Sequence, residues 1–528
     1  MGLLQIKNLN LSIGDTQILQ DISLQAEAGK IVAIIGESGS GKSMTAYCVN
    51  RLLPRGANVS GQVMFDGQDM LQLPEPALCD IRGADIGMVF QEPMTALNPV
   101  QTIGAQVAET VLIHGAAQKS EALKIARETL NRVGLPAAEF PLSRYPHELS
   151  GGQRQRVVIA MAIALRPKLL IADEPTTALD VTTQAQILGL LKKLVVEDGM
   201  ALLLISHDLG VVADIADTIA IMRRGKVVES GPVKQVFAEM NHPYTRALFK
   251  ASNHVPDRAA KAQETPILQV SGLVRDYILP RKSLFGAPPK LRAVNDVGFS
   301  IKRGESLGLV GESGCGKSTL TRAILGLDAV QAGRIEIDGR AVTAGEKVPR
   351  ELRRKMQVVF QDPYGSFNPR HKVMRLVAEP FHLLDNAPTG SARHQAVEKA
   401  LTEVGMLAAD ADKYIHEFSG GQRQRIAIAR ALIIKPELII LDEAVSALDV
   451  SIRAQILDLL AGLSDRLGLS YLFISHDLSV VRAITDRVMV MKSGKIIETG
   501  DTETVFTAPQ HPYTKALIAA APVLEKTP

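Results

Sequence analysis

Short apolar runs alternate with amphipathic stretches along this chain, and the alternation predicts strands interleaved with helices. The runs Ile31–Ile35 and Leu307–Val310 contain no polar residue, as expected for strands that are buried on both faces of a sheet. Further along, apolar residues recur at the spacing of one helix face until a proline ends the pattern: Val157, Ala160, Met161, Ala164, Leu165 and then Pro167. This order predicts an α/β fold with a largely parallel core sheet covered by helices.

A long internal repeat divides the sequence into two halves. Gly-Glu-Ser-Gly occurs at 36–39 and again at 311–314. Ser-Gly-Gly-Gln-Arg-Gln-Arg begins at residue 150 and again at residue 419, and His-Pro-Tyr-Thr begins at residue 242 and again at residue 511. Repeats this far apart indicate two duplicated domains and not a solenoid of short units.

The repeat predicts a first domain over residues 1–255, a linker over 256–266 and a second domain over 267–528. The predicted linker is polar and charged, and it begins and ends with proline, which is typical of connectors. The second half also contains an extra Pro-, Lys- and Arg-rich stretch near Pro280–Lys290, which we interpret as a solvated surface loop.

The composition is that of soluble globular domains. The 528 residues are too many for one ordinary core, and 46% of them are hydrophobic and 22% charged. The net charge of +3 gives no support to a large nucleic-acid surface. The three cysteines lack a CxxC spacing, which excludes a disulfide framework and argues against structural zinc. We expect no signal peptide, and no apolar run approaches the roughly 18 residues of a spanning helix.

Two glycine-rich segments fit the pattern G-x4-G-K-[ST] between a strand and a helix, namely Gly36–Ser43 and Gly311–Ser318. Glycines allow backbone N–H groups to converge on phosphate oxygens, and the following helix contributes its positive end. In each segment the lysine is expected to reach the outer phosphates and the last serine to hold Mg²⁺. The pattern occurs twice in the same context, so we predict two phosphate sites.

Each half also carries two adjacent carboxylates at the end of an apolar strand, Asp173-Glu174 and Asp442-Glu443. Because residues alternate across a strand, the two side chains are expected to diverge and to take different roles. The aspartates are expected to act through the metal shell. The glutamates are expected to polarise the attacking water, a role typically worth about 10² to 10⁴ in rate.

Two further pairs of polar residues lie where apolar runs end. His207 and His476 each follow such a run, and a contact with the γ-phosphate is expected for both. Gln91 and Gln361 each follow Val-Phe, and taken alone they would be solvated turn residues.

Together these segments resemble the ATP-binding-cassette superfamily over nearly the whole chain. The most diagnostic element is Leu149-Ser-Gly-Gly-Gln153 with its partner Phe418-Ser-Gly-Gly-Gln422, each preceding a helix whose N-terminus can bind an anion. The resemblance implies two tandem cassettes, each with a mostly parallel core sheet, an antiparallel β subdomain and a helical signature subdomain. It also implies that two ATP molecules are held between paired cassettes, each by the phosphate loop of one cassette and the signature of the other.

The resemblance assigns roles to individual residues of this chain. The implied catalytic residues are Glu174, His207, Glu443 and His476. The implied nucleotide-binding residues are Gly36, Glu37, Ser38, Gly39, Ser40, Gly41, Lys42, Ser43, Gln91, Ser150, Gly151, Gly152, Gln153, Tyr277, Gly311, Glu312, Ser313, Gly314, Cys315, Gly316, Lys317, Ser318, Gln361, Ser419, Gly420, Gly421 and Gln422. The implied Mg²⁺ ligands are Ser43, Gln91, Asp173, Ser318, Gln361 and Asp442. One site would join the first phosphate loop to the second signature, and the other site the reverse pair.

More narrowly, the chain resembles the fused ATPases of the oligopeptide/dipeptide/nickel importer group. The segments Gln91–Pro99 and Gln361–Arg370, together with both His-Pro-Tyr-Thr-x-Ala-Leu motifs, are similar to that group. Its layout is most similar to single-chain members for peptide-type cargo, including the microcin C importers. This implies ATP hydrolysis that drives import, two permease subunits, an extracytoplasmic substrate-binding protein and no nucleic acid. It also implies a peripheral location on the cytoplasmic side of the inner membrane.

The alternative is a soluble tandem cassette that acts on ribosomes or DNA, but such relatives tend to carry a long charged arm or zinc-binding cysteines. A regulatory module that no longer hydrolyses ATP conflicts with the presence of both glutamates. The chain departs from the family at Ile13, where an aromatic residue commonly stacks on adenine, whereas Tyr277 fits that role in the second half. The second half also reads Glu443-Ala-Val where the first reads Glu174-Pro-Thr, and no cysteine cluster follows His-Pro-Tyr-Thr, so no iron–sulfur cluster is expected.

Overall fold

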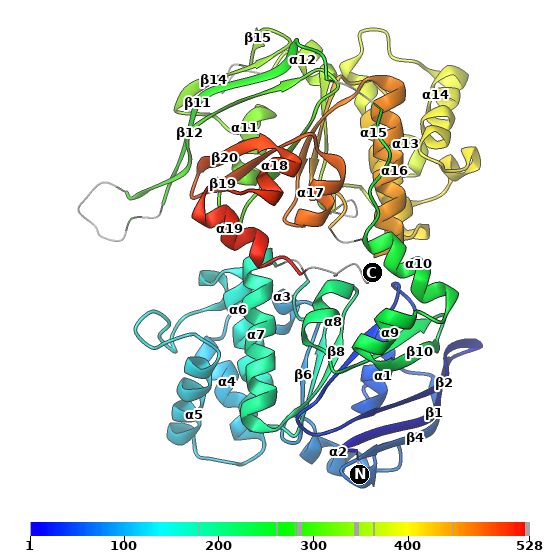
Figure 1. Cartoon of the computed structure of the whole chain (residues 1–528), viewed down its shortest axis with the longest axis vertical. Coiled ribbons are helices and arrows are strands. Elements are labelled where there is room, and N and C mark those ends of the chain that lie inside the picture. The colour runs from blue at the N-terminus through cyan, green and yellow to red at the C-terminus, as the bar shows by residue number, and fades with distance from the viewer. Residues whose placement is uncertain are drawn as a thin grey trace. The chain divides into compact units, whose positions relative to one another are not determined.

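The computed structural model describes residues 2–177, 179–259, 262–279, 281, 288–342, 348–362, 365–446 and 448–522 (Figure 1). The chain forms two compact units, one made chiefly of residues 2–252 and the other chiefly of residues 253–521. Most of the expected surface loop, residues 280 and 282–287, lies outside the described residues.

A six-stranded sheet forms the centre of the first unit, in the order β10-β9-β3-β8-β7-β6. The four pairs from β6 to β9 are parallel, and β10 pairs with β9 in the antiparallel direction. Every residue of β3, β7 and β8 is buried, which is why these strands read as continuous apolar runs. The strands are β3 (Ile31–Ile35), β6 (Ile86–Val89), β7 (Leu169–Asp173), β8 (Ala201–Ile205), β9 (Thr218–Arg223) and β10 (Lys226–Pro232).

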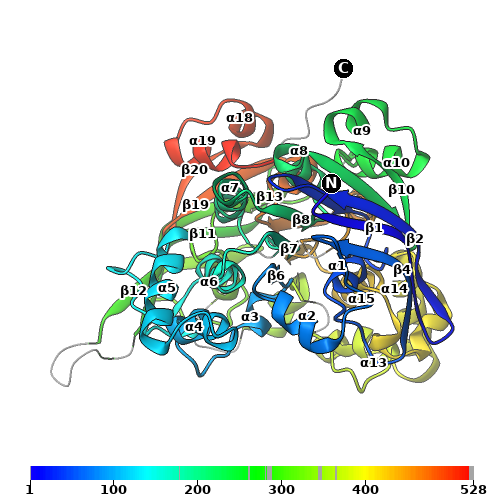
Figure 2. The same cartoon turned by 90° about the horizontal axis from the view of Figure 1, so that it is seen from below.

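A second, antiparallel sheet has the order β2-β1-β4-β5. Its apolar side chains share one core with α1 and one face of the central sheet. Figure 2 shows strands β1, β2 and β4 side by side. These elements are β1 (Leu4–Ile13), β2 (Thr16–Ala26), β4 (Ala57–Phe65), β5 (Gln68–Asp69) and α1 (Lys42–Val49).

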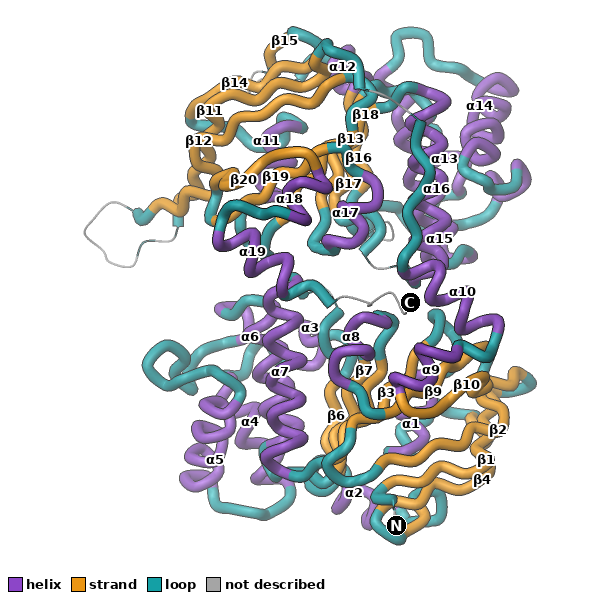
Figure 3. Tube along the Cα trace, in the orientation of Figure 1, coloured by secondary structure: helices purple, strands orange, loops and turns teal. Residues whose placement is uncertain are grey.

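Helices α4 to α7 pack together on the other side of the central sheet and share a second core with β7 and β8 (Figure 3). The helix predicted around residues 157–165 is α6, which begins earlier, at Gly151, and ends before Pro167. The helices of the first unit are α2 (Glu75–Ile81), α3 (Pro93–Ala96), α4 (Ile103–Ile113), α5 (Lys119–Arg132), η1 (Pro146–Glu148), α6 (Gly151–Ile163), α7 (Val181–Asp198), α8 (Leu209–Ile215), α9 (Val233–Glu239) and α10 (Pro243–Ser252).

The second unit repeats this architecture, with a central sheet in the order β16-β17-β18-β13-β19-β20 and an antiparallel sheet in the order β12-β11-β14-β15. Its strands are β11 (Pro266–Ile278), β12 (Lys290–Lys302), β13 (Ser306–Val310), β14 (Ala332–Ile337), β15 (Arg340–Ala341), β16 (Met356–Val359), β17 (Leu438–Asp442), β18 (Ser470–Ile474), β19 (Arg487–Lys492) and β20 (Lys495–Asp501). Its helices are α11 (Lys317–Ile324), α12 (Arg350–Lys355), α13 (Val373–Val377), η2 (Glu379–Leu383), α14 (Gly390–Glu403), η3 (Ala408–Asp412), η4 (Ile415–Glu417), α15 (Gly420–Leu432), α16 (Val450–Leu467), α17 (Leu478–Ile484), α18 (Thr502–Thr507) and α19 (Pro512–Ala519). The α/β prediction, with parallel core sheets in two halves, is confirmed.

The segment expected to be a linker makes specific contacts with the second unit. The Arg258 guanidinium donates to the carbonyl oxygen of Ile484 at 2.5 Å and lies 3.3 Å from the carboxylate of Asp486. The N–H of Ala259 donates to the carboxylate of Asp465. Residues 260 and 261 of this segment lie outside the described residues. Its described part is therefore fastened to the second unit along much of its length.

Among the described residues, no helix combines the length and the apolar character that crossing a bilayer requires.

Candidate functional site

The carboxyl ends of parallel strands meet at one edge of each central sheet, and the candidate residues are gathered there. In the first unit the loop 36–41 follows β3, Glu174 follows β7 and His207 lies just beyond β8. The second unit places its loop 311–316, Glu443 and His476 after the matching strands. Residues that are far apart in sequence therefore form one cluster in each unit.

Each phosphate loop contains positions whose backbone conformation or close packing requires glycine. A Cβ atom at Gly36 would lie 2.2 Å from the carbonyl oxygen of Met222, and one at Gly311 would lie 2.2 Å from that of Met491. Gly41 and Gly316 precede helices α1 and α11 with left-handed φ angles of 103° and 113°. The loop amides are thus wrapped closely in front of a helix N-terminus, which suits an anionic phosphate.

A buried lysine closes each loop. The Lys42 ammonium donates to the carbonyl oxygens of Gly36, at 2.8 Å, and Glu37, at 3.0 Å. Lys317 makes the corresponding two bonds in the second unit. Burial lowers the pKa of Lys42. The lysines hold a positive charge inside the loop, where phosphate oxygens would be received.

The first unit offers a ligand set that fits Mg²⁺. The Ser43 hydroxyl donates to Oδ1 of Asp173 at 3.1 Å. The other carboxylate oxygen, Oδ2, is buried and has no hydrogen-bond partner among the described residues. Burial raises the pKa of Asp173, because its charge lacks full compensation. A hydroxyl and an uncompensated carboxylate oxygen side by side are what a hard divalent cation requires.

Glu174 is the centre of a hydrogen-bonded cluster. Its Oε2 accepts hydrogen bonds from the side-chain amide of Gln91, at 3.0 Å, and the hydroxyl of Thr177, at 2.9 Å. His207 Nδ1 lies 3.2 Å from the same oxygen. Burial alone would raise the pKa of Glu174, but the bond and charge of His207 lower it to about 2. The carboxylate is ionised at neutral pH, so it orients and polarises a water more readily than it removes its proton.

The second unit repeats this cluster with weaker support. His476 Nδ1 lies 3.3 Å from Oε2 of Glu443, and this contact lowers the pKa of Glu443 against the effect of burial. Ser446 takes the place of Thr177, and its hydroxyl donates to the backbone carbonyl of Glu443 and not to the carboxylate. The sequence difference after the second glutamate thus changes how that side chain is held.

Both glutamates adopt left-handed backbone conformations, with φ of 48° at Glu174 and 51° at Glu443. A non-glycine residue with such a φ costs on the order of 1 kcal/mol. The N–H of Glu174 donates to the carbonyl of Ile205, and that of Glu443 donates to the carbonyl of Ile474. The neighbouring strand therefore holds each glutamate in a conformation that it would not choose alone.

The signature segments cap helices α6 and α15. The Ser150 hydroxyl accepts from the N–H of Gln153 at 3.3 Å, and the N–H of Ser419 donates to the side chain of Gln422 at 3.0 Å. A Cβ atom at Gly152 would lie 2.2 Å from the Thr183 side chain, so close helix packing requires glycine there. Ser150 and Gly151 in the first unit, and Ser419 and Gly420 in the second, are exposed, which leaves these helix N-termini accessible to an anion. Within the described part of the first unit, no hydrogen bond joins the signature to the loop 36–43.

Tyr277 lies beside the second phosphate loop. Its hydroxyl donates to Oδ2 of Asp328 at 3.0 Å and lies 3.5 Å from that of Thr319, near the start of α11. The Arg275 guanidinium covers the ring at 4.5 Å. Ile13 in the first unit pairs with Thr16 at the end of a hairpin and offers no aromatic ring. The two units therefore differ where a base would stack.

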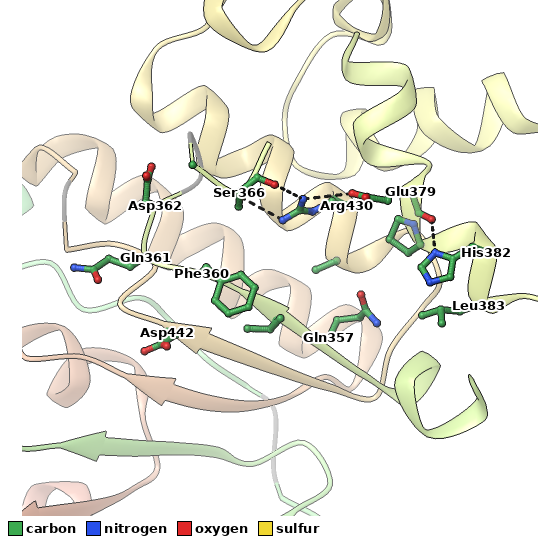
Figure 4. Close-up of a pocket in the computed structure, with 14 residues that line it drawn as sticks. Gln357, Phe360, Gln361, Asp362, Ser366, Glu379, His382, Leu383, Arg430 and Asp442 are labelled. Carbon is green, nitrogen blue, oxygen red and sulfur yellow. Dashed lines mark hydrogen bonds and ion pairs between the residues drawn. The ribbon is translucent and has the colours of Figure 1, made fainter. Parts of the chain in front are cut away.

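A cavity of 760 Å³ opens beside Gln361 and Asp442 in the second unit (Figure 4). The Arg430 guanidinium donates to the carbonyl of Ser366, at 3.1 Å, and lies 3.6 Å from Glu379. Met161 occupies the repeat position of Arg430 in the first unit. The cavity links the end of the central sheet to the helical part of this unit, and Arg430 gives its wall a positive charge that the first half lacks at the matching position.

Replacing Asp442 with asparagine is expected to stabilise the protein in the absence of nucleotide and metal. Burial raises the pKa of Asp442 from 3.8 to about 6, and the charge of Glu443 adds to the effect. The free energy of unfolding therefore falls as pH rises from about 4 to about 6, and the deficit is complete at neutral pH. We expect a gain of about 3 kcal/mol in urea unfolding near neutral pH. The gain should shrink as the pH is lowered to about 5, and a gain independent of pH would contradict the assignment.

The structure also reveals contacts that the motifs did not predict. Thr177 supports Glu174, Asp328 holds Tyr277, and Tyr244 and Tyr513 each accept a hydrogen bond from a phosphate loop. Of these contacts, the sequence could have indicated the two tyrosines, because both belong to the repeated His-Pro-Tyr-Thr segment. The other two contacts depend on side-chain positions that the sequence pattern does not encode.

Comparison with protein families gives two matches in each half. The model described as "ABC transporter" matches residues 19–177 and 294–446. The model described as "Oligopeptide/dipeptide transporter, C-terminal region" matches residues 228–271 and 497–527.

Individual proteins match over the full length. The chain is 46% identical over 526 residues to the peptidoglycan transport ATP-binding protein YejF of Agrobacterium fabrum, covering 98% of this chain and 96% of that protein. It is 46% identical over 563 residues to the glutathione import ATP-binding protein GsiA of Salmonella typhimurium, covering 99% and 90%. Among solved structures, cbiO1 from Clostridium perfringens, part of the ABC transporter complex cbiONQ, aligns with a TM-score of 0.40 and 30% identity. That alignment covers 46% of this chain and 92% of the other.

Proposed function

This chain belongs to the ABC transporter family of ATP-binding proteins, and from that premise we propose that it energises an importer for peptides or peptide-like compounds. As members of the family do, it binds and hydrolyses ATP. The observation that carries the proposal is the match of both C-terminal regions to oligopeptide/dipeptide transporters, combined with full-length identity to ATP-binding proteins of peptidoglycan and glutathione import. The alternative of a soluble ATPase on ribosomes or DNA finds no support among these relatives.

Each unit supplies the groups that hydrolysis needs. The phosphate loop and its lysine would bind the triphosphate, while Ser43 with Asp173, and Ser318 with Asp442, would hold Mg²⁺. When bound, the ion supplies charge neutralisation for the phosphates. Glu174 and Glu443 would orient the attacking water, and His207 and His476 keep these carboxylates ionised and in place.

We assign the remaining nucleotide contacts by the family pattern. Gln91 and Gln361 would contribute to the Mg²⁺ and water shell, and the Gln91 side chain already donates to Glu174. Ser150–Gln153 and Ser419–Gln422 would each bind the phosphates of an ATP held by another phosphate loop, which the exposed helix N-termini favour. Closing on ATP and opening after hydrolysis would then be coupled to transport, because ATP and its products stabilise the two states differently.

The partners we propose are two membrane-spanning permease subunits and an extracytoplasmic substrate-binding protein, with the chain bound peripherally on the cytoplasmic side of the inner membrane. Exposed apolar side chains of the first unit, such as Val100 and Ile113, and the cavity of the second unit offer surfaces for contact with such subunits.

When the tagged chain is purified from a detergent extract of the cells that naturally produce it, two polytopic membrane proteins are expected to co-purify. Reconstitution of that complex in proteoliposomes should give ATP-dependent peptide uptake that requires the binding protein. A complex that carries the Glu174→Gln and Glu443→Gln substitutions should assemble but fail to transport. Recovery of ribosomes or DNA in place of membrane proteins would contradict the proposal.

A further inference from the structure

The His-Pro-Tyr-Thr segment of each unit reaches the phosphate loop of the same unit. In the first unit, the N–H of Glu37 donates a hydrogen bond to the hydroxyl oxygen of Tyr244 at 3.2 Å. In the second unit, the N–H of Glu312 donates to the hydroxyl oxygen of Tyr513 at 3.1 Å. Each contact joins the second residue of the loop to a tyrosine more than 200 residues away. Both units form this hydrogen bond independently, so it belongs to the fold that the two units share.

The turn that carries the tyrosine is itself held firmly. In the first unit, the Glu229 carboxylate accepts hydrogen bonds from the N–H groups of Asn241, at 2.8 Å, and His242, at 3.1 Å. The Thr245 hydroxyl also donates to Glu229. The N–H of Tyr244 in turn donates to the His242 ring at 3.1 Å. These bonds fix the first turn of α10, so the tyrosine side chain leaves the helix in a defined direction.

The second unit repeats this arrangement on β20 and α19. The Glu498 carboxylate accepts from the N–H groups of Gln510, at 2.7 Å, and His511, at 3.1 Å. The N–H of Tyr513 donates to the His511 ring at 3.0 Å. The histidine of the motif therefore serves the turn in both units, the threonine does so in the first unit, and the tyrosine reaches the loop in both.

Both tyrosine rings are buried between the helix and the last parallel strand. Tyr244 is 6% exposed and lies under the Arg223 guanidinium, 4.8 Å from its ring centre. Tyr513 is 8% exposed and lies under the Lys492 ammonium at 4.5 Å. Burial raises the pKa of Tyr244 to about 12, so the hydroxyl stays neutral. The hydrogen bond from each loop is itself partly buried, so competition from water is reduced.

We propose that Tyr244 and Tyr513 are positioning residues that hold the phosphate loops in the form that binds ATP. The bond fixes the peptide between the first and second loop residues, and the amides that follow must point the same way to meet the phosphates. The C-terminal helix of each unit thereby sets the ATP affinity of that unit. This inference rests on ATP binding at the two loops and does not depend on the cargo.

The test replaces each tyrosine with phenylalanine in the full-length chain, which removes the hydroxyl alone. Tyr244→Phe is studied with Lys317→Ala, and Tyr513→Phe with Lys42→Ala, so that one intact loop remains in each protein. Loss of one net hydrogen bond is expected to weaken binding of a fluorescent ATP analogue about three- to tenfold. The rate at which bound nucleotide is hydrolysed should stay near that of the protein that carries the lysine substitution alone. Hydrogen exchange of the peptide that covers the remaining loop should become faster.

Tyr471→Phe provides a matched control in the second unit. The Tyr471 hydroxyl is fully buried and donates to the carbonyl of Leu460 at 2.9 Å, so its removal lowers stability without touching the loop. Nucleotide affinity should be unchanged in this variant while its unfolding midpoint falls. Equal weakening of ATP binding by Tyr471→Phe and Tyr513→Phe would overturn the inference, as would unaltered affinity in both loop variants. If the Lys317→Ala and Lys42→Ala parent proteins bind no ATP, both the proposed function and this inference fail. If the parents bind ATP and the tyrosine variants bind it equally well, only this inference fails.

Discussion

Replacement of both Glu174 and Glu443 by glutamine lowers the rate of ATP hydrolysis by about 10² to 10⁴ while ATP stays bound. This is the expected result because the amide keeps the shape of the side chain but cannot polarise the attacking water. The phosphate loops and their lysines are untouched, so nucleotide binding should persist. The measurement is phosphate release at saturating ATP, together with the nucleotide retained after rapid desalting.

Exposed glutamates provide the control for that double variant. Glu239→Gln and Glu503→Gln change the same chemical group at surface positions in α9 and α18. Their hydrolysis rate should equal that of the parent chain. Full activity in the variant that lacks both Glu174 and Glu443 would remove these residues from the reaction.

The single variants Glu174→Gln and Glu443→Gln should lower the rate of ATP hydrolysis by different factors. Three side chains meet at the Oε2 atom of Glu174, whereas Ser446 bonds to the backbone of Glu443 and leaves its carboxylate with less support. The first glutamate is thus better oriented before ATP arrives.

Gly316→Ala is expected to weaken ATP binding at the second loop by about 100-fold. The added Cβ would lie 2.3 Å from the carbonyl oxygen of Ala293 and 2.9 Å from the Met491 side chain. The φ of 113° at this position adds strain for any residue with a Cβ atom. The loop must move away from β12 to relieve both, so its amides lose their common direction. Titration with a nucleotide analogue, in a chain whose first loop carries Lys42→Ala, measures the loss.

Gly314→Ala separates steric conflict from backbone strain. Gly314 has a φ of 78°, but a Cβ atom there would meet no described heavy atom within 4 Å. Strain alone should reduce affinity by about fivefold. Equal losses in the two variants would show that the contact with Ala293 does not shape the loop.

Much of the fold could be predicted from the sequence, because buried parallel strands have a simple signature. Ile31–Ile35 and Leu307–Val310 are apolar throughout since both faces of those strands are covered, and both form strands beside a phosphate loop. The start of α6 at Gly151 was harder to predict, since the apolar periodicity begins six residues later while the helix is capped by Ser150. A hydrophobic pattern marks the buried face of a helix and not its end.

The details of the candidate sites were less accessible to sequence reasoning. The residue types at the strand ends indicated phosphate and metal chemistry, but the bond between Gln91 and Glu174 joins residues 83 positions apart. The ion pair between Arg453 and Asp477, at 2.6 Å, is another example, and Gln184 replaces that arginine in the first half. Such contacts depend on how helices pack against the sheet, and periodicity carries no information about them.

The left-handed φ angles of Glu174 and Glu443 mean that backbone relaxation and the proposed chemistry make opposite demands on these two positions. Glycine tolerates a φ near 50° freely, so glycine at either position would relieve the backbone strain, but it would also remove the carboxylate and its contact with the histidine. The backbone strain is therefore retained at two positions where the proposed reaction needs a carboxylate.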